Sequence, residues 1–560
     1  MIETTYKRWL NYPKLESYLL DQLRTYNQQD IYQAFYQDID FGTAGMRGLL
    51  GAGINRINIY SVRKANYGFS KYLLSNYKDG ISVVIGYDNR HYSKELALDS
   101  ARYLSFFGIK VYLYDKLVST PQLSVSVRYL KCNGGIMITA SHNPKEYNGY
   151  KLYNEYGSQL MPDIIKKIKD NMNDIDDILN LEYECNESLI EYLNDDIDDI
   201  YTDMVLDIRL YPNVDKNINI VYSPLHGASY KAVSSVLKKA NYNLIEVKEQ
   251  VSPDPNFTNT ISANPQSVDA YSMVIEYGNR YNGDILLVCD PDGDRMGLSV
   301  LHNNEYHLVD GNQTGVLLIK YILDYKKKYN LLKDNMVIYS TIVTSPLGTL
   351  LATHYNIKTV NTLTGFKYIS NLIRELEIDN KLDLYILGYE ESYGSLINTN
   401  VRDKDATQAC LLLSEACAYY KSLGMTLIDV LDTIYADIGY YYNHMDTIEL
   451  DALSGEELLN DLMNKFRDYL NIDFGNNTID IYIDYLSLTM VKDSVKSLVD
   501  ESLCANVIKY IFKDGSFIAI RPSGTEPQCK IYYSIYGKNK DIAYQQYNIF
   551  NKYINKMINE

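Results

Sequence analysis

The stretch Ile136-Met137-Ile138-Thr139-Ala140-Ser141-His142-Asn143-Pro144 runs from a short apolar segment directly into a polar loop. Apolar residues followed by a turn are typical of a buried strand, which places Ser141 at the carboxyl end of that strand. Pro144 biases the residue before it towards an extended conformation, so no helix is expected to begin at once. Ligands gather at this end of open α/β sheets. Ser141 is therefore a candidate nucleophile, and the alternative is a serine that caps an ordinary turn.

The same pattern of a short apolar run followed by a loop recurs along the chain. The runs lie at residues 81–85, 218–222, 285–289, 336–339 and 384–387. Longer patterns typical of helices separate them, for example Thr314 to Tyr325 and Ala406 to Leu423. Alternating strands and helices predict α/β layers with mostly parallel sheets. The acidic stretch 174–199 is expected to form solvated helix faces, and strand patterns at 517–520 and 531–535 predict an α+β tail.

The second loop, Asp290-Pro291-Asp292-Gly293-Asp294-Arg295, also follows an apolar run. Three carboxylates at alternate positions can converge on one hard cation and leave room for a phosphoryl oxygen, which suits Mg2+. Arg295 could bind the same phosphate with two hydrogen bonds. An EF-hand loop is excluded, because its sixth position would be Arg295 and its twelfth Leu301. A solvated acidic turn is the other interpretation, but the apolar run before it favours a buried metal site.

Two further loops carry groups that bind sugars and phosphates. In Gly388-Tyr389-Glu390-Glu391-Ser392-Tyr393-Gly394, Glu390 and Ser392 are suitable partners for sugar hydroxyls. In residues 521–527, Arg-Pro-Ser-Gly-Thr-Glu-Pro, an arginine, two hydroxyls and a glycine could bind a phosphate. Each loop could also be an ordinary turn. There is no GxxxxGK[ST] motif, so the sequence does not predict a P-loop that binds a nucleoside triphosphate.

Composition narrows the class of protein. The chain has 560 residues, of which 46% are hydrophobic, and about three to five domains are expected. A formal net charge of -17 argues against a broad nucleic-acid or membrane surface. The seven scattered cysteines and few histidines favour neither a disulfide framework nor a zinc site. The N-terminus does not look like a secretory signal, so a cytoplasmic location is expected.

Taken together, the four loops resemble those of the α-D-phosphohexomutase superfamily, in the same order and across nearly the whole chain. Five shorter motifs carry the same resemblance: residues 41–48, 86–90, 148–151, 362–367 and 402–405. The length of the chain and Tyr389 before Glu390-Glu391-Ser392 look most like the long branch with phosphoglucomutase and phosphopentomutase.

The resemblance implies an α/β fold: three related α/β domains and a smaller C-terminal α+β domain around a central cleft. The expected divisions are an N-terminal extension with the phosphoserine domain at 1–205, a metal-binding domain at 206–308, a sugar-binding domain at 309–440 and a phosphate-binding domain at 441–560.

The resemblance also implies roles for individual residues. Ser141 would carry the phosphoryl group and would bind Mg2+ together with Asp290, Asp292 and Asp294. Arg47, Lys151 and Arg295 would surround the phosphoryl in transfer. Substrate would be bound by Lys367, Glu390, Ser392, Lys404, Arg521, Ser523, Gly524 and Thr525. Some family members carry a histidine where Tyr393 and Gly394 stand here, so the general base is open between His142 and Lys151, and Lys151 is preferred.

The activity that the resemblance implies is interconversion of glucose 1-phosphate and glucose 6-phosphate through a phosphoserine and a bisphosphate intermediate, with glucose 1,6-bisphosphate as activator. Small sugar phosphates are the expected partners, and the sequence gives no oligomeric state. Alternatives inside the family are a phosphopentomutase, a phosphomannomutase or a bisphosphate synthase. Outside it, a non-catalytic regulator that binds sugar phosphates and a magnesium-dependent phosphatase remain.

Overall fold

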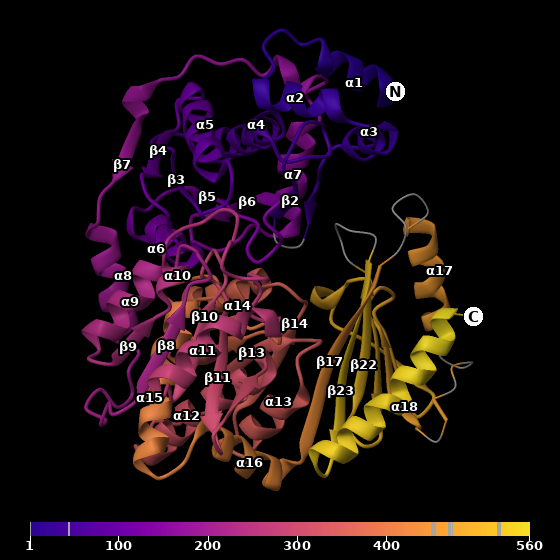
Figure 1. Cartoon of the computed structure of the whole chain (residues 1–560). Helices are drawn as coiled ribbons and strands as arrows, with labels where there is room; N and C mark the ends of the chain where they lie inside the picture. The colour runs from indigo at the N-terminus through magenta and orange to yellow at the C-terminus, as the bar shows by residue number, and fades with distance from the viewer. Residues whose placement is uncertain are drawn as a thin grey trace. The chain divides into compact units, whose positions relative to one another are not determined.

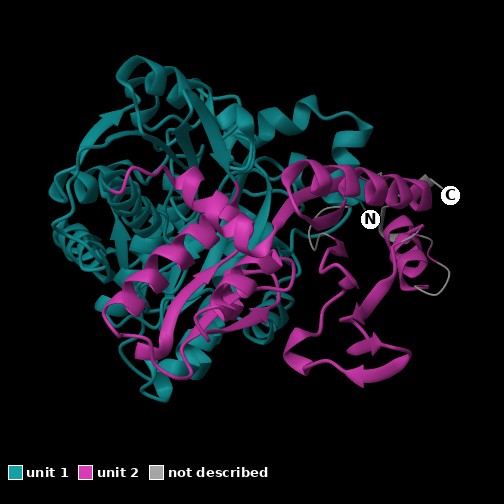
Figure 2. Cartoon of the chain, turned by 90° about the horizontal axis from the view of Figure 1, so that it is seen from below, with its two compact units in different colours: residues 1–309, 370–382, 393–422 teal, residues 310–369, 383–392, 423–560 magenta. Residues whose placement is uncertain are grey.

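The computed structural model describes residues 2–42, 45–449, 455–468, 472, 474–475, 477–522 and 528–559. The chain divides into two compact units. Unit 1 comprises residues 1–309, 370–382 and 393–422, and unit 2 comprises residues 310–369, 383–392 and 423–560 (Figure 2). Among the described residues, no helix is both long and apolar enough to span a bilayer.

Unit 1 begins with three short helices, α1 (Ile2–Leu10), α2 (Ser17–Thr25) and α3 (Gln28–Phe35). Their buried faces pack around Trp9, Leu19, Leu23 and Phe35 in one apolar cluster. The capping box between Asn27 and Asp30 fixes the start of α3 by satisfying backbone N–H groups that the helix itself leaves open.

The first sheet of unit 1 has seven strands in the order β1-β2-β6-β5-β3-β4-β7 (Figure 1). Its strands are β1 (Phe41–Gly42), β2 (Gly45–Leu49), β3 (Ser82–Tyr87), β4 (Lys110–Tyr114), β5 (Gly134–Ile138), β6 (Tyr147–Asn154) and β7 (Ile190–Leu193). Strand β3 pairs in parallel with β4 and β5, whereas β6 is antiparallel to β5. The helices that accompany it are α4 (Ile59–Asn76), α5 (Ser93–Phe106), α6 (Thr120–Tyr129), α7 (Pro162–Met172) and α8 (Asp196–Leu206). Strand β7 corrects the expectation of helix faces throughout 174–199, because Ile190 to Leu193 pair in parallel with β4.

The second sheet of unit 1 has the order β12-β11-β10-β8-β9. Its strands are β8 (Asn219–Ser223), β9 (Asn243–Glu246), β10 (Ile285–Cys289), β11 (Met296–His302) and β12 (Glu305–Val309). Strands β9, β8 and β10 are parallel, and β11 returns antiparallel to β10 after the acidic loop. Its helices are α9 (Tyr230–Lys239), α10 (Lys248–Val251), α11 (Ser272–Tyr281) and α15 (Ala406–Ser422).

Unit 2 contains two sheets. One has the parallel strands β14-β13-β15, which are β13 (Val337–Thr341), β14 (Lys358–Thr362) and β15 (Tyr385–Tyr389). The helices α12 (Gly311–Lys328), α13 (Pro346–Thr353) and α16 (Leu427–Ile438) lie in the same unit, and α14 (Phe366–Ile378) begins there.

The other sheet of unit 2 is antiparallel throughout, in the order β17-β23-β22-β21-β18-β19-β20. Its strands are β17 (Tyr440–Glu449), β18 (Ile479–Asp484), β19 (Thr489–Lys492), β20 (Val495–Leu498), β21 (Ile508–Phe512), β22 (Phe517–Pro522) and β23 (Gln528–Gly537). Helices α17 (Gly455–Arg467) and α18 (Lys540–Asn559) pack on it (Figure 1). Three sheets with parallel strands and one antiparallel sheet with two helices confirm the predicted α/β fold with a C-terminal α+β domain.

Candidate active site

Ser141 lies where the sequence predicted, in the loop after strand β5. It is buried, and its backbone is left-handed with φ of 53°, a conformation that costs energy for any residue with a side chain. Its Oγ donates a hydrogen bond of 2.7 Å to Asp290 Oδ2, and His142 Nδ1 lies 3.1 Å from the same oxygen. The predicted nucleophile and the first predicted metal ligand are therefore in direct contact within unit 1.

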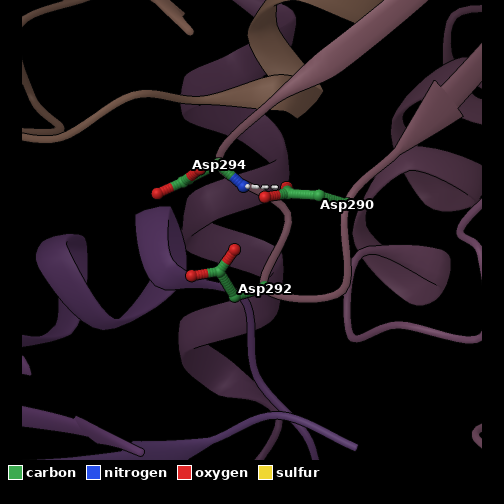
Figure 3. A group of neighbouring side chains, drawn as sticks. All are labelled: Asp290, Asp292 and Asp294. Carbon is green, nitrogen blue, oxygen red and sulfur yellow. Dashed lines mark hydrogen bonds between the residues drawn. The ribbon is translucent and has the colours of Figure 1, made fainter. Parts of the chain in front are cut away.

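The three aspartates of the acidic loop converge after strand β10. Figure 3 shows Asp290, Asp292 and Asp294, and one oxygen from each carboxylate lies within 4.8 Å of the others. All three are buried. The loop turns tightly, since the backbone N–H groups of Asp294 and Arg295 both donate to Asp290 Oδ1, at 3.1 and 2.9 Å. The left-handed φ of 68° at Gly293 permits this turn.

Neighbouring segments of unit 1 fix the backbone of this acidic loop. Ala228 N donates to Pro291 O at 2.7 Å, Thr120 N to Asp292 O at 2.8 Å and Ala406 N to Gly293 O at 3.3 Å. Gly227 packs so closely that a Cβ there would lie 2.4 Å from Pro291 Cα. The carboxylates are thus held by a backbone whose carbonyl groups are already hydrogen-bonded.

Basic side chains surround the carboxylates. Lys151 Nζ donates to Asp292 Oδ2 at 2.6 Å and to Asp294 Oδ2 at 3.3 Å. Lys404 Nζ lies 3.1 Å from Asp294 Oδ2, and Arg295 Nε lies 3.7 Å from Asp294 Oδ1. Lys404, which the resemblance assigned to substrate binding, therefore lies among the same carboxylates as Lys151.

Arg47, on strand β2, contacts the serine loop (residues 139–146, which include Ser141). Its Nη1 donates to Asn143 Oδ1 at 3.3 Å, while its buried Nε has no hydrogen-bond partner among the described residues. Burial lowers the pKa of Arg47, and the nearby Asp292 partly offsets this. A buried donor without a partner is costly, so this guanidinium can gain from an anionic ligand.

Burial and neighbouring charges push the pKa values in the site apart. Burial, with the charges of Asp292 and Asp294, raises the pKa of Asp290 well above its usual range. Burial acts in the same direction on Asp292, but the charge and hydrogen bond of Lys151 prevail and lower its pKa. Burial and then Arg295 and Arg47 hold the pKa of His142 well below its usual range, so this imidazole is neutral at pH 7.

The residues present fit a divalent metal ion. Asp292 Oδ1 and Asp294 Oδ1 are buried and make no hydrogen bond with any described residue. Burying such oxygens is costly unless a cation or donor reaches them. A bound divalent cation would also relieve the repulsion among the three carboxylates, and an all-oxygen donor set suits a hard ion such as Mg2+. The buried triad could therefore hold a metal ion.

Unit 2 contains a second cluster of predicted residues. Lys367 lies in the first turn of helix α14, and its pKa is lowered to about 8 by burial and then by the charge of Arg521. Arg521 lies at the end of β22 and also hydrogen-bonds Tyr532. Glu390 Oε1 accepts a hydrogen bond of 3.0 Å from Gly365 N, and Ser392 is half-buried in the same unit. Ser523, Gly524 and Thr525 lie outside the described residues.

Thr120 is a residue of the site that the sequence did not reveal. Its Oγ1 donates to Asp292 Oδ2 at 3.1 Å, in addition to the backbone bond described above. The only signal was the helix start Ser119-Thr120-Pro121, which indicates an N-terminus. Nothing in that signal pointed to an aspartate 172 positions away.

Four family models match this chain in order. They describe the α/β/α domains I, II and III and the C-terminal domain of phosphoglucomutase/phosphomannomutase, at residues 38–178, 199–303, 310–437 and 487–540. The chain belongs to the phosphoglucomutase/phosphomannomutase family. The predicted family and the predicted enzyme class, a mutase, are thereby confirmed.

Relatives in the phosphoglucomutase/phosphomannomutase family match over most of their length. The phosphoglucomutase of Staphylococcus haemolyticus is 35% identical over 538 residues, covering 94% of this chain and 95% of the relative. That of Staphylococcus aureus is 36% identical over 533 residues, covering 93% and 94%. Among solved structures, parafusin from Paramecium, a phosphoglucomutase, aligns with a TM-score of 0.68 at 19% identity, covering 94% of this chain and 96% of that chain. A family protein from Burkholderia thailandensis aligns with a TM-score of 0.67 at 16% identity, covering 92% and 97%.

Proposed function

We propose that this protein is a magnesium-dependent phosphoglucomutase that interconverts glucose 1-phosphate and glucose 6-phosphate through a phosphorylated Ser141. The observation that carries the proposal is the 2.7 Å contact between Ser141 Oγ and Asp290, inside a buried group of three carboxylates ringed by cations. Phosphoryl transfer needs positioning and charge neutralisation more than covalent chemistry, and this arrangement offers both. The relatives from Staphylococcus haemolyticus and Staphylococcus aureus, 35% and 36% identical, are phosphoglucomutases, which supports glucose phosphates as substrates.

In the proposed first half-reaction, the phosphoryl group leaves Ser141 Oγ for a hydroxyl oxygen of the sugar phosphate. The bond from phosphorus to Ser141 Oγ breaks, a bond to the sugar oxygen forms, and the hydroxyl gives up its proton. The product is glucose 1,6-bisphosphate, which then returns its other phosphoryl group to Ser141. Glucose 1,6-bisphosphate also serves as activator, because it can phosphorylate an empty Ser141.

The chain's own groups have separate tasks in this scheme. Asp290, Asp292 and Asp294 would hold Mg2+, which when bound supplies positive charge next to the phosphoryl oxygens. Arg47 and Arg295 neutralise the same oxygens. Lys151 exchanges the proton with the sugar hydroxyl, as the preferred general base. His142 is the alternative base, and its neutral imidazole beside Ser141 Oγ keeps it eligible.

Substrate binding is assigned to the remaining predicted residues. Lys367 and Arg521 would bind a phosphate group. Glu390 would accept hydrogen bonds from sugar hydroxyls, and Ser392 would donate hydrogen bonds to them. Lys404, beside Asp294, would bind a phosphoryl oxygen. Ser523, Gly524 and Thr525 keep their predicted role in the phosphate clamp. The divisions at 1–205, 206–308, 309–440 and 441–560 and a cytoplasmic location are part of the same proposal.

A coupled assay tests the proposal. Wild type and Ser141→Ala are supplied with glucose 1-phosphate, Mg2+ and a trace of glucose 1,6-bisphosphate, and glucose 6-phosphate is measured. The matched control is Ser105→Ala, a buried serine of helix α5 that donates to Arg102 O at 2.7 Å. We expect full activity in wild type and in the control, and none in Ser141→Ala.

Three other results would each have a defined meaning. Activity that survives in Ser141→Ala would overturn the proposed nucleophile. Release of inorganic phosphate without glucose 6-phosphate would indicate a phosphatase. Activity with ribose 1-phosphate or mannose 1-phosphate but not with glucose 1-phosphate would keep the phosphoserine and replace the substrate.

A further inference from the structure

The motif Gly86-Tyr87-Asp88-Asn89-Arg90 begins in the last two residues of strand β3 and continues into the loop after it, and β3 pairs with β5, the strand that precedes the loop with Ser141. The side chains of Asp88 and Arg90 are both completely buried, and Arg90 Nε lies 3.3 Å from Asp88 Oδ2. A fully buried ion pair is costly to desolvate, so its presence needs an explanation beyond stability. The partners of Arg90 supply one.

Among the described residues, the guanidinium of Arg90 donates its hydrogen bonds to backbone carbonyls of residues 141–147. Its Nη2 donates to Ser141 O at 2.7 Å and also to Asn143 O. Its Nη1 donates to Pro144 O at 2.8 Å and to Tyr147 O at 3.0 Å. One rigid, planar group thus joins four carbonyl groups over seven residues. A lysine ammonium in the same place is a single point charge and could not reproduce this fork.

Asp88 reaches the same loop from the other side through Thr139. Thr139 Oγ1 donates to Asp88 Oδ2 at 2.6 Å and accepts a hydrogen bond of 2.8 Å from Ser141 N. Asp88 Oδ1 accepts from Arg90 N at 3.0 Å and from Ser93 Oγ at 2.8 Å. Both the N–H and the C=O of Ser141 are therefore hydrogen-bonded to this group, either directly or through one hydroxyl.

These contacts surround a strained residue. Ser141 has φ of 53°, and a residue with a side chain keeps such a conformation only when its surroundings impose it. The Phe257 ring covers the guanidinium, with its centroid 5.3 Å from Arg90 Cζ. The position of Ser141 Oγ beside Asp290 thus depends on Arg90, Asp88 and Thr139. Among the described residues, none of these three hydrogen-bonds Asp290, Asp292 or Asp294.

We propose that Arg90, with Asp88 and Thr139, is a positioning residue that holds Ser141 in its left-handed conformation and so aims Oγ at the phosphoryl group. The inference rests on the proposed phosphoserine function. Displacement of reacting atoms by about 1 Å can slow an enzyme ~100-fold, so loosening this loop slows phosphoryl transfer without removing any group that binds the metal.

The experiment measures phosphorylation of Ser141 directly. Dephosphorylated enzyme with Mg2+ is mixed with glucose 1,6-bisphosphate and quenched at set times, and Ser141 phosphate is quantified by mass spectrometry. Mg2+ binding to the same preparations is measured by calorimetry. The variant is Arg90→Lys, which keeps the charge and loses the fork. The control is Arg63→Lys, since Arg63 makes the same kind of fork to Asp99, at 2.9 and 2.7 Å, on helix α4 of the same unit.

We expect Arg90→Lys to phosphorylate Ser141 about 100-fold more slowly than wild type, with Mg2+ affinity within about threefold. Arg63→Lys should match wild type in both measurements. A wild-type rate in Arg90→Lys would overturn the inference. So would loss of Mg2+ binding in parallel with the rate, because Arg90 would then support the site as a whole.

Thr139→Val keeps the test decisive if Arg90→Lys does not fold. This nearly isosteric change removes the hydroxyl between Asp88 and Ser141 N. We expect transfer about tenfold slower, restored in Thr139→Ser, and a wild-type rate in Thr139→Val would overturn the inference. If wild type itself never acquires phosphate on Ser141, the proposed function fails and the positioning role fails with it. If wild type acquires the phosphate and both variants do so at the wild-type rate, the proposed function stands and the positioning role fails.

Discussion

The carboxylate cluster around Ser141 in unit 1 and the Lys367–Arg521 pair in unit 2 differ in the charge of their neighbours. Asp292 and Asp294 each lie close to a cation, through Lys151, Lys404 and Arg295. Lys367, in contrast, is buried beside the like charge of Arg521, and its pKa falls to about 8. In the first region, side chains of opposite charge lie next to one another. In the second region, burial and the like charge of Arg521 disfavour the charged form of Lys367, and under the proposed function a bound phosphate would favour it.

The largest effect should come from removing one carboxylate of the cluster around Ser141, with Asp292→Asn. The change removes one proposed metal ligand and leaves Lys151 buried with one carboxylate fewer, and uncompensated buried charges typically cost about 3–5 kcal/mol. We expect mutase turnover to fall about 1000-fold and Mg2+ affinity about 100-fold, consistent with losses of that size. Calorimetry and the coupled assay measure the two quantities.

The control for that experiment is Glu276→Gln, which removes an exposed carboxylate that pairs with Arg280 one helical turn away. Exposed pairs of this kind contribute little, so the control should retain full activity and Mg2+ affinity. Unchanged Mg2+ affinity in Asp292→Asn would contradict the assignment of the triad as the metal site.

A smaller effect should follow from removing one charge of the Lys367–Arg521 pair, with Lys367→Met. Loss of a charged hydrogen bond to a phosphate is worth about 1.5–3 kcal/mol, which corresponds to a 10- to 100-fold rise in KM for glucose 1-phosphate. The value of kcat should change much less, since the proposed chemistry takes place at Ser141. Lys333→Met, which removes an exposed lysine paired with Asp383, is the control and should keep the wild-type KM.

Titration offers a gentler way to remove the same charge. Because the pKa of Lys367 is about 8 instead of the ordinary 10.5, the lysine is charged below pH 8 and neutral above it. KM should therefore be constant below about pH 7, rise about twofold by pH 8 and about tenfold by pH 9, and the rise should vanish in Lys367→Arg. Steady-state kinetics at constant ionic strength give this profile. A flat profile in wild type would show that Lys367 does not bind the phosphate.

The same lysine makes a prediction for stability, and its sign is opposite to that of binding. Between pH 8 and pH 10.5 the unfolded chain holds a proton on Lys367 that the folded chain does not. Stability of unit 2 should therefore rise with pH in this window, by up to about 1.4 kcal/mol per pH unit from this group. The difference in thermal midpoint between wild type and Lys367→Met, followed against pH, isolates this contribution.

The sequence predicted the local parts of both regions and few of the long-range contacts within each unit. Short apolar runs placed Ser141 and the three aspartates at strand ends, because an apolar run followed by a turn is a local signal. It did not predict that residues 190–193 form a strand, since their pairing with β4 depends on the rest of the sheet. The four carbonyl groups gathered by Arg90 and the hydrogen bond from Thr120 to Asp292 are likewise long-range contacts.

Lys404 shows the same limit for a residue that the sequence did single out. Its motif, Arg402-Asp403-Lys404-Asp405, resembled the family pattern but carried no information on which side chains it would meet. In the structure its ammonium lies 3.1 Å from Asp294, while Lys367 lies with Arg521 in unit 2. A motif identifies a residue type, and only packing determines which charges that residue neutralises.

The smallest effect we expect concerns Thr120, an uncharged residue that hydrogen-bonds Asp292 in the carboxylate cluster. Thr120→Val removes the hydrogen bond of 3.1 Å from Oγ1 to Asp292 Oδ2 and keeps the shape of the side chain and the backbone bond. One such bond is worth about 1 kcal/mol, so Mg2+ affinity should fall about fivefold. Thr120→Ser should restore it. The control is Thr433→Val on helix α16, whose Oγ1 donates to Val430 O within its own helix. Calorimetry decides between the outcomes. A change equal to that of Asp292→Asn would mean that Thr120 shapes the whole loop. No change at all would mean that Lys151 alone fixes Asp292.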